Sequence, residues 1–197
     1  MEESIKYLQS IITPFAGLTE NDISVSLPFW RKRQIPKGNF YNKQNVVCKD
    51  LAVVVKGIFR VYYHDPETDE ERNIFFFSEC QFIVSFRSFI HQYPCNYYIE
   101  ALEDAEILYV PYQDLQNLYT EHKCWERFGR ILAEHFFNQS QARAEGFQFL
   151  THEQRYLNLI NEHPNIVQRI PSYHIASYLG IKNPSLSRIK KRIQDSK

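Results

Sequence analysis

The sequence of 197 residues lacks any run of about 18 apolar residues, the length that a helix needs to cross a bilayer. Its opening residues, MEESIKYLQS, are acidic and polar, which does not resemble a secretory signal. We therefore expect a cytoplasmic protein with no membrane partner. Hydrophobic residues still make up 44% of the chain, enough for a sizeable core rather than wholesale disorder.

Residues that commonly form metal and catalytic motifs are scattered. No C-x-x-C, H-x-H or H-x-x-x-H spacing occurs, which argues against a local zinc or iron–sulfur site, and no haem signature is evident. No Gly-rich phosphate loop and no serine or cysteine nucleophile motif appears. We expect no enzyme and no metal, and the sequence does not identify a cofactor. The four cysteines, expected to be buried free thiols, are Cys48, Cys80, Cys95 and Cys124.

Net charge is absent as well, because 23 basic residues balance 23 acidic ones. The balance hides an asymmetry. Residues 150–197 hold eight basic and three acidic residues, a net +5, whereas the preceding 149 residues hold 15 basic and 20 acidic ones, a net −5. A basic terminal segment can supply the phosphate contacts that carry much of the affinity for nucleic acid. The overall neutrality therefore conceals a candidate nucleic-acid-binding module.

The first segment, residues 1–111, is predicted to be mostly β-structure. Short runs of β-branched and aromatic residues, separated by polar turns and by Gly57, are typical of a sandwich or a barrel-like roll. Only the opening part favours helices. The predicted strands cover 51–63, 72–77, 97–101 and 106–110, and the predicted helices cover 5–12 and 18–25.

The second segment, residues 112–149, is predicted to be a long connecting helix, because it contains no proline. Apolar or small residues recur on or near a heptad along it, with His135 and Gln139 at intervening positions. We interpret this stripe as a dimer seam. An ordinary helix packed on its own domain is the alternative. The stripe consists of Leu118, Trp125, Phe128, Leu132, Ala142, Gly146 and Phe149.

The third segment, residues 150–197, is predicted to carry a helix-turn-helix between Pro171 and Ile193. Gly180 lies at the turn, where a positive φ favours glycine. Asn183 is the expected N-cap of the second helix, and Pro184 falls in its first turn, where the missing N–H is harmless. The expected buried positions are Ile175, Ala176, Leu179, Ile181, Leu186, Ile189 and Ile193.

The opposite face of the second helix is polar and basic, which suits contacts with base edges and phosphates in a major groove. We therefore predict that this segment binds double-stranded DNA, with Arg188 as the best single candidate for a base contact. A helical hairpin whose basic face is merely solvated is the alternative. The predicted DNA-binding residues are Lys182, Asn183, Ser185, Ser187, Arg188, Lys191 and Arg192.

Several segments together resemble the Crp/Fnr family of bacterial regulators. These segments are 36–38, 53–62, 77–79, 99–107 and 175–181 with 186–188. The resemblance implies an α+β protein with an N-terminal double-stranded β-roll of the cyclic nucleotide-binding type, a long dimerisation helix and a C-terminal winged helix-turn-helix domain. It also implies a homodimer that regulates transcription at a roughly palindromic operator, with RNA polymerase as a further candidate partner.

The sequence departs from this family where its members hold a cyclic nucleotide. Glu79 matches a family glutamate, but Ser78 replaces the glycine, and residues 91–97 lack the arginine for the cyclic phosphate. Losing a bidentate arginine removes the charge-assisted bonds of such a site. We therefore do not expect cyclic AMP to bind, and we expect Glu79 to be a satisfied polar residue of the roll. The remaining candidates for an effector pocket are Glu79, Arg87, Gln92 and Tyr97.

Two other classes of function stay open at this point. A regulatory module that acts through protein partners would not use the basic segment, and salt-dependent DNA binding distinguishes it from a DNA-binding protein. A cupin-like enzyme would need clustered histidine and glutamate ligands, but the β segment holds only His64 and His91 as histidines. Asn183-Pro184-Ser185 stands where the best-known family members have Arg-Glu-Thr, so the resemblance does not imply the operator sequence.

Overall fold

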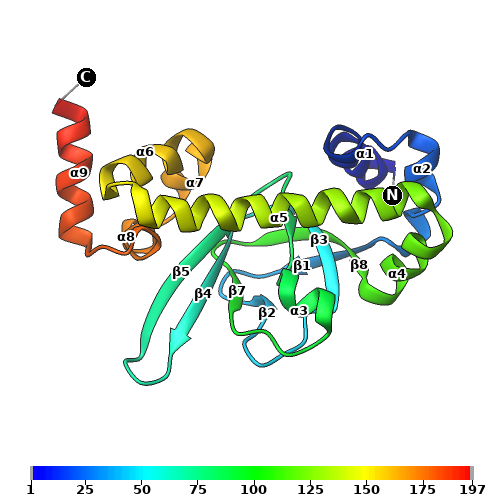
Figure 1. Ribbon diagram of the computed structural model, residues 1–197, viewed down its shortest axis with the longest axis horizontal. Helices are drawn as coiled ribbons and strands as arrows, with labels where there is room; N and C mark the ends of the chain where they lie inside the picture. The colour runs from blue at the N-terminus through cyan, green and yellow to red at the C-terminus, as the bar shows by residue number, and fades with distance from the viewer. Residues whose placement is uncertain (1, 196–197) are drawn as a thin grey trace.

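The computed structural model describes residues 2–195, and it places two four-stranded antiparallel sheets beneath one long helix (Figure 1). The strand order is β1-β8-β3-β6 in the first sheet and β2-β7-β4-β5 in the second. This arrangement confirms the predicted α+β class and the N-terminal β-roll. The strands are β1 (Arg31–Ile35), β2 (Phe40–Asn42), β3 (Asp50–Lys56), β4 (Phe59–Asp65), β5 (Glu70–Phe77), β6 (Phe82–Ile83), β7 (Tyr98–Ala101) and β8 (Ala105–Pro111).

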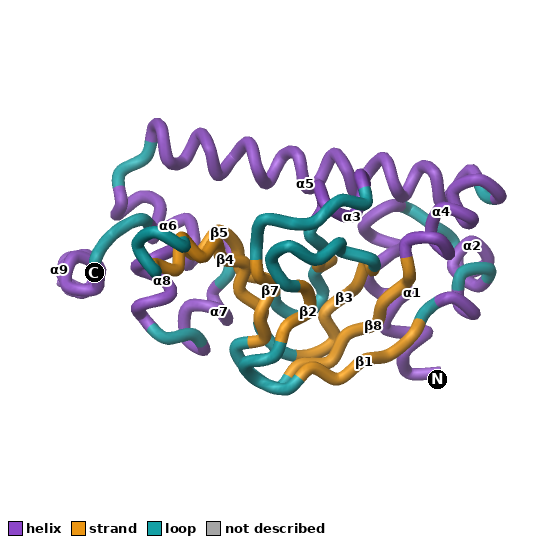
Figure 2. Tube along the Cα trace, turned by 90° about the horizontal axis from the view of Figure 1, so that it is seen from below, coloured by secondary structure: helices purple, strands orange, loops and turns teal. Residues whose placement is uncertain are grey.

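Helices precede, interrupt and follow the roll, and Figure 2 shows them above and beside the sheets. The two predicted N-terminal helices are confirmed. The helical elements are α1 (Glu2–Ala16), α2 (Glu20–Ser24), the 3-10 turn η1 (Leu27–Phe29), α3 (Phe86–His91), α4 (Tyr112–Glu121), α5 (Lys123–Phe149), α6 (His152–Glu162), α7 (Pro164–Arg169), α8 (Ser172–Leu179) and α9 (Asn183–Asp195).

The turn between β3 and β4 requires Gly57. Its φ angle is +105°, and a Cβ atom built there would lie 2.6 Å from the Cβ atom of Ala105 and 2.8 Å from its Cα atom. The backbone N–H of Gly57 donates a hydrogen bond to Glu79 Oε1 at 2.8 Å. The close approach of these backbones leaves no room for a side chain, as the glycine in the sequence suggested.

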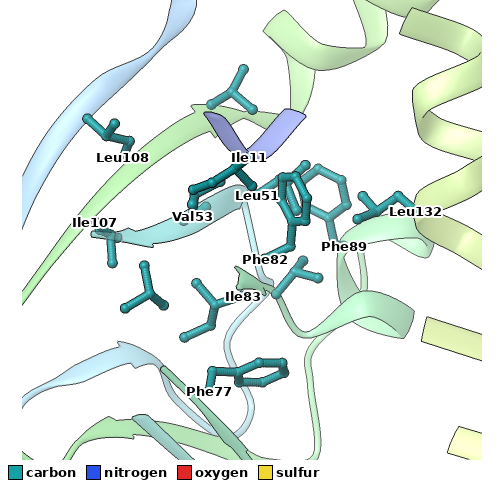
Figure 3. Close-up of a cluster of buried hydrophobic side chains, with 14 of the residues drawn as sticks. Ile11, Leu51, Val53, Phe77, Phe82, Ile83, Phe89, Ile107, Leu108 and Leu132 are labelled. Carbon is teal, nitrogen blue, oxygen red and sulfur yellow. The ribbon is translucent and has the colours of Figure 1, made fainter. Parts of the chain in front are cut away.

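The core of the roll is completed by α5. Trp125, Phe128 and Leu132 are buried against it, and the indole N–H of Trp125 donates to the carbonyl oxygen of Asp22 at 2.9 Å. Figure 3 shows Leu132 among the buried side chains of the sheets. Together with Leu118, these residues were expected to belong to a dimer seam. That interpretation of them is wrong, because the open face of the roll needs an apolar cover and this stripe supplies it.

Residues 112–149 form two helices rather than the single helix predicted. His122 has an extended backbone, with φ −131° and ψ 109°. Its N–H donates to the carbonyl oxygen of Leu118 at 2.9 Å and ends α4, while its own carbonyl accepts from the N–H of Trp125 at 2.9 Å at the start of α5. Neither proline nor glycine marks this break in the sequence.

A second core gathers the C-terminal helices and joins them to the roll. It includes Leu159 of α6 and Leu186 of α9, and also Ile58 and Phe76 from the roll. Phe76 and its neighbour Phe77 point to opposite faces of β5, so that Phe77 belongs to the core of the roll. Strand β5 is therefore shared by both cores, and the C-terminal helices are docked on it.

One part of the expected C-terminal fold is not seen. Every element between residues 112 and 195 is a helix, so this part of the chain does not form the wing of the predicted winged helix-turn-helix. The predicted division into domains at residues 111 and 149 remains a prediction.

Candidate nucleic-acid interface

The turn between α8 and α9 is built on Gly180, as predicted. Its φ angle is +71° and its ψ angle 32°, which is the left-handed conformation. The N–H of Gly180 donates to the carbonyl oxygen of Ser177 at 3.1 Å, and that of Ile181 donates to Ala176 at 3.0 Å. These bonds satisfy carbonyl groups that the end of α8 leaves open.

Helix α9 begins one residue earlier than the capping prediction requires. The carbonyl oxygen of Lys182 accepts the first helical hydrogen bonds, from the N–H of Ser185 at 2.9 Å and that of Leu186 at 3.3 Å. Asn183 therefore lies inside the first turn, and its prediction as the N-cap is wrong by one position. Pro184 lies in the first turn as predicted, where no helical bond needs its nitrogen.

The inner faces of α8 and α9 hold the two helices against each other. Ile175, Ala176 and Leu179 of α8 are buried, and so are Leu186 and Ile189 of α9. Ile181 and Ile193 are partly buried against the same core. The predicted buried faces are therefore confirmed, and they fix which side of α9 remains accessible.

The outer face of α9 carries exposed polar and basic residues. Ser187, Arg188 and Lys191 lie on the side opposite the buried residues, as the period of 3.6 residues requires. Lys182 and Asn183 are exposed at its N-terminal end. Arg188 donates to Ser185 Oγ at 3.1 Å, which holds its side chain along the helix.

Two of the predicted DNA-binding residues turn toward α6 instead. Arg192 bonds to Glu153 at 2.8 Å, and Ser185 is half-buried. A groove of about 620 Å³ between the start of α6 and α9 is lined by both residues and by Arg188. The predicted set thus divides into an outward group and a group beside α6, with the exposed Arg188 at the border between them.

Helix α8 is held on β5 by a buried polar network. The N–H of Asn73 donates to Ser177 Oγ at 3.0 Å, and Asn73 Nδ2 donates to the carbonyl oxygen of His174 at 3.1 Å. Arg60 Nη1 lies 3.3 Å from His174 Nδ1 and 2.6 Å from Glu71 Oε2. Burial and the charge of Arg60 lower the pKa of His174 to about 4. The docked helix therefore contains a neutral histidine.

A second connection joins α7 to the roll. Arg169 binds both carboxylate oxygens of Glu79, at 2.8 and 2.9 Å, and also contacts Glu103. The Arg169 guanidinium holds the pKa of Glu79 at about 2, well below its usual range. Because the other bond of Glu79 comes from Gly57 N–H, its carboxylate is fully engaged. Glu79 therefore links the roll to α7, and both of its carboxylate oxygens accept hydrogen bonds.

The four predicted effector-pocket residues do not gather in one place. A cavity of about 410 Å³ lies between the second sheet, α3 and α5, and Arg87 and Tyr97 line it. Glu79 does not line it, and neither does Gln92, which donates to the carbonyl oxygen of Phe89 at 2.6 Å. The other lining residues are apolar or uncharged, among them Val61, Ile74, Phe75, Phe77, Val84, Ser85, Phe86, Ile99, Phe136, Phe137 and Gln139.

Comparison with known proteins agrees with this architecture. Residues 32–122, which run from β1 to the end of α4, match the sequence model of the family described as cyclic nucleotide-binding domain. This segment is therefore similar in sequence to that domain. No match was found among curated protein sequences.

Several solved structures resemble nearly the whole chain in fold. FixK2 from Bradyrhizobium japonicum has a TM-score of 0.73 at 12% identity, over 85% of each chain. A putative transcriptional regulator of the Crp/Fnr family from Eubacterium rectale has a TM-score of 0.69 at 17% identity, over 91% of this chain and 85% of the other. The Thermus thermophilus catabolite activator protein has a TM-score of 0.58 at 16% identity, over 92% and 86%. The resemblance to the Crp/Fnr family is confirmed at the level of the fold.

The described residues offer neither a cluster of metal ligands nor a helix that could span a membrane. No group of three or more histidine, cysteine, aspartate or glutamate side chains between residues 2 and 195 is placed to hold a metal ion. None of the helices in that range is both long and apolar enough to span a bilayer. Sequence reasoning missed Arg169, since its partner Glu79 stands 90 residues away in the chain and no local pattern announces the pair.

Proposed function

We propose that this protein is a transcription regulator that binds double-stranded DNA through the outer face of α9. The observation that carries the proposal is that α9 has one buried face and one exposed basic face. Its inner face is fixed on α8 by Leu186 and Ile189, while Arg188 and Lys191 point to solvent on the other side. A helix held in this way can enter a major groove with its basic face toward the DNA. The net charge of +5 in residues 150–197 supports phosphate contact.

A regulatory module that acts only through protein partners accounts less well for these features. Such a module does not need a glycine-built turn that presents a basic helix, and Figure 1 shows α9 at the extreme end of the molecule, away from the sheets. The cyclic nucleotide-binding domain would then be the part that senses a signal, and α9 the part that delivers the response.

The proposed assembly is a homodimer along α5. Its outer side carries the half-buried Ala133 and the exposed Phe137, Ser140 and Ala144, whose 4-3-4 spacing is that of a coiled-coil seam. The first three also lie at the edge of the cavity between the second sheet, α3 and α5. Phe137 is 66% exposed, which is unusual for a phenylalanine in the middle of a helix. This seam replaces the one expected from the sequence, and two copies packed on it would present two α9 helices to a palindromic site.

The proposed effector of the cyclic nucleotide-binding domain is not cyclic AMP. Among the described residues that line the cavity between the second sheet, α3 and α5, the sole charged one is Arg87, which lies over the ring of Tyr93 at 5.6 Å. The carboxylate of Glu79 is bonded to Arg169 outside this cavity. A cyclic phosphate and a ribose would therefore face aromatic and aliphatic side chains. An uncharged apolar molecule fits this lining better.

Replacing Arg188 by alanine tests the DNA-binding role directly. We expect the affinity for the selected operator to fall by about 1–3 kcal/mol, with relaxed preference at one base position, because a base contact is lost. The measurement is a fluorescence-anisotropy titration of operator DNA and of single-base variants. Arg31→Ala, at the exposed start of β1 in the first sheet, removes the same charge away from α8 and α9 and should leave both unchanged. Equal behaviour of the two variants would refute the role of Arg188.

A further inference from the structure

A second cavity lies where the roll meets the C-terminal helices. Its volume is about 490 Å³, and residues of β5, α5, α6 and α8 line it. Aromatic rings form much of its surface, including those of Phe75, Phe147 and Tyr178. It shares Phe75, Phe77 and Gln139 with the cavity that Arg87 lines, but it opens beside α6 and α8 rather than beside α3.

Two arginines project into this aromatic cavity. The guanidinium carbon of Arg143 lies 4.2 Å from the ring centroid of Tyr178 and 4.9 Å from that of Phe147. The guanidinium carbon of Arg155 lies 4.3 Å from the same Phe147 ring. Stacking of this kind occupies the flat faces of the guanidinium groups and leaves their N–H edges available for a ligand.

Neither arginine is neutralised by a carboxylate. No residue between 2 and 195 forms an ion pair with Arg143 or Arg155, although Glu162 is among the residues that line the cavity. Arg143 Nη2 donates to the carbonyl oxygens of Asn73 and Tyr178, at 3.2 and 3.3 Å. Nε and Nη1 of Arg155 are buried and have no hydrogen-bond partner at all.

This arrangement is costly in the absence of a ligand. Where the buried N–H groups of a guanidinium lack an acceptor, as Nε and Nη1 of Arg155 do, the group loses part of its hydration without a compensating hydrogen bond. Burial lowers the pKa of both arginines from the usual value, and the charge of Arg155 adds to the effect on Arg143. Two guanidinium groups brought together in a partly enclosed aromatic cavity can hold an anion, since the anion supplies the missing acceptors.

We propose that this cavity binds a small organic anion, in which a carboxylate or phosphate group is attached to an aromatic or other apolar body. The free N–H edges of Arg155 and the guanidinium of Arg143 would hold the charged group. The rings of Phe75 and Tyr178 would cover the apolar body. A cavity of this volume exceeds what a bare inorganic anion fills, and its aromatic surface would leave such an ion poorly solvated.

The position of the cavity gives the ligand a regulatory consequence. Its lining joins β5 of the roll to Tyr178 of α8, the first helix of the helix-turn-helix. A bound anion would strengthen the docking of α8 on β5 and so shift the orientation in which α9 is presented. This consequence rests on the proposed function, whereas binding of the anion does not, so the two are measured separately.

The binding experiment uses the full-length protein without DNA. Calorimetric titrations compare 2-naphthoate, 1-naphthyl phosphate, the uncharged 2-naphthamide and inorganic phosphate. We expect at least one of the two naphthyl anions to bind at least tenfold more tightly than both the amide and inorganic phosphate. Arg155→Gln should abolish this preference, while Arg87→Gln, in the other cavity, should keep it. Absence of binding by both naphthyl anions, or equal binding of anion and amide, would overturn the proposal.

A second readout separates ligand binding from a structural role of Arg155. Removing a partly buried guanidinium whose Nε and Nη1 lack acceptors should raise the melting temperature of the ligand-free protein by about 2–4 °C in Arg155→Met. An arginine that merely supports the fold would lower the melting temperature when replaced. A lower melting temperature together with unchanged anion binding would contradict the proposal, whether or not the protein binds DNA.

Discussion

Replacing Gly57 by alanine is expected to lower the free energy of unfolding by about 3 kcal/mol or more. Two effects add. A side chain at φ +105° is strained, and its Cβ atom would lie 2.6 Å from the Cβ atom of Ala105 and 2.8 Å from the Cα atom. The atoms it meets belong to the start of β8, which cannot move aside as the end of a flexible side chain could. Displacing Gly57 would also disturb its hydrogen bond to Glu79.

Gly38→Ala is the matched control for this prediction. Gly38 also has a positive φ, of +79°, but a Cβ atom there would meet nothing within 4 Å. Its replacement should therefore cost only the backbone strain, about 1–2 kcal/mol. Urea unfolding of the two variants and the parent protein measures both losses. Equal losses would show that the close approach to Ala105 is not what requires glycine at position 57.

Lowering the pH from about 6.5 to about 4 is expected to weaken the docking of α8 through His174. Burial and the charge of Arg60 lower the pKa of His174 to about 4. Arg60 and the side-chain amide of Asn73 both donate toward Nδ1, which must be unprotonated to accept. Between these pH values His174 is protonated in the unfolded chain but stays neutral in the folded chain. The free energy of unfolding therefore falls as the pH falls, by up to about 3 kcal/mol.

The variant His174→Gln isolates this contribution. Because glutamine does not titrate, the part of the acid destabilisation between about pH 6.5 and 4 should disappear. His152→Gln, at the exposed start of α6, removes a histidine away from the Arg60–Glu71 network and should keep it. Denaturant unfolding at a series of pH values measures the difference. If His174→Gln retains the full pH dependence, the histidine at the α8–β5 junction is not its source.

Local chemistry made a large part of the fold predictable. The dense β-branched and aromatic run at 51–63 gave two strands divided at Gly57, and the glycine at position 180 gave the turn of the helix-turn-helix. In both places the backbone conformation allows few residues other than glycine. The buried faces of α8 and α9 followed equally from their helical spacing.

The features that sequence reasoning missed depend on distant parts of the chain. Strand β1 reads Arg-Lys-Arg-Gln-Ile and is mostly exposed, so it shows no alternation of apolar residues, and pairing with β8 makes it a strand. The break at His122 occurs without proline or glycine. There the covering of the roll by Trp125 and Phe128 competes with continuation of the helix, and the tertiary packing prevails.

The candidate sites also divide into those that a local sequence pattern predicts and those that depend on distant parts of the chain. The basic face of α9 could be read from one continuous segment, because a helix brings residues three and four apart to one side. The partners Arg169 and Glu79 stand 90 residues apart, and Arg143 lies 70 residues from Asn73, whose carbonyl oxygen it binds. Only the folded chain reveals that Arg155 lacks such a partner.

Selection of bound fragments from random double-stranded DNA tests the central claim most directly, namely that α9 reads DNA. We expect recovery of inverted repeats whose half-sites are about one helical turn apart. Affinity for them should fall at least about a hundredfold between about 50 and 200 mM salt, and the double variant Arg188→Ala, Lys191→Ala should recover no sequence. Recovery of no common sequence by the parent protein, with affinity independent of salt, would contradict the account.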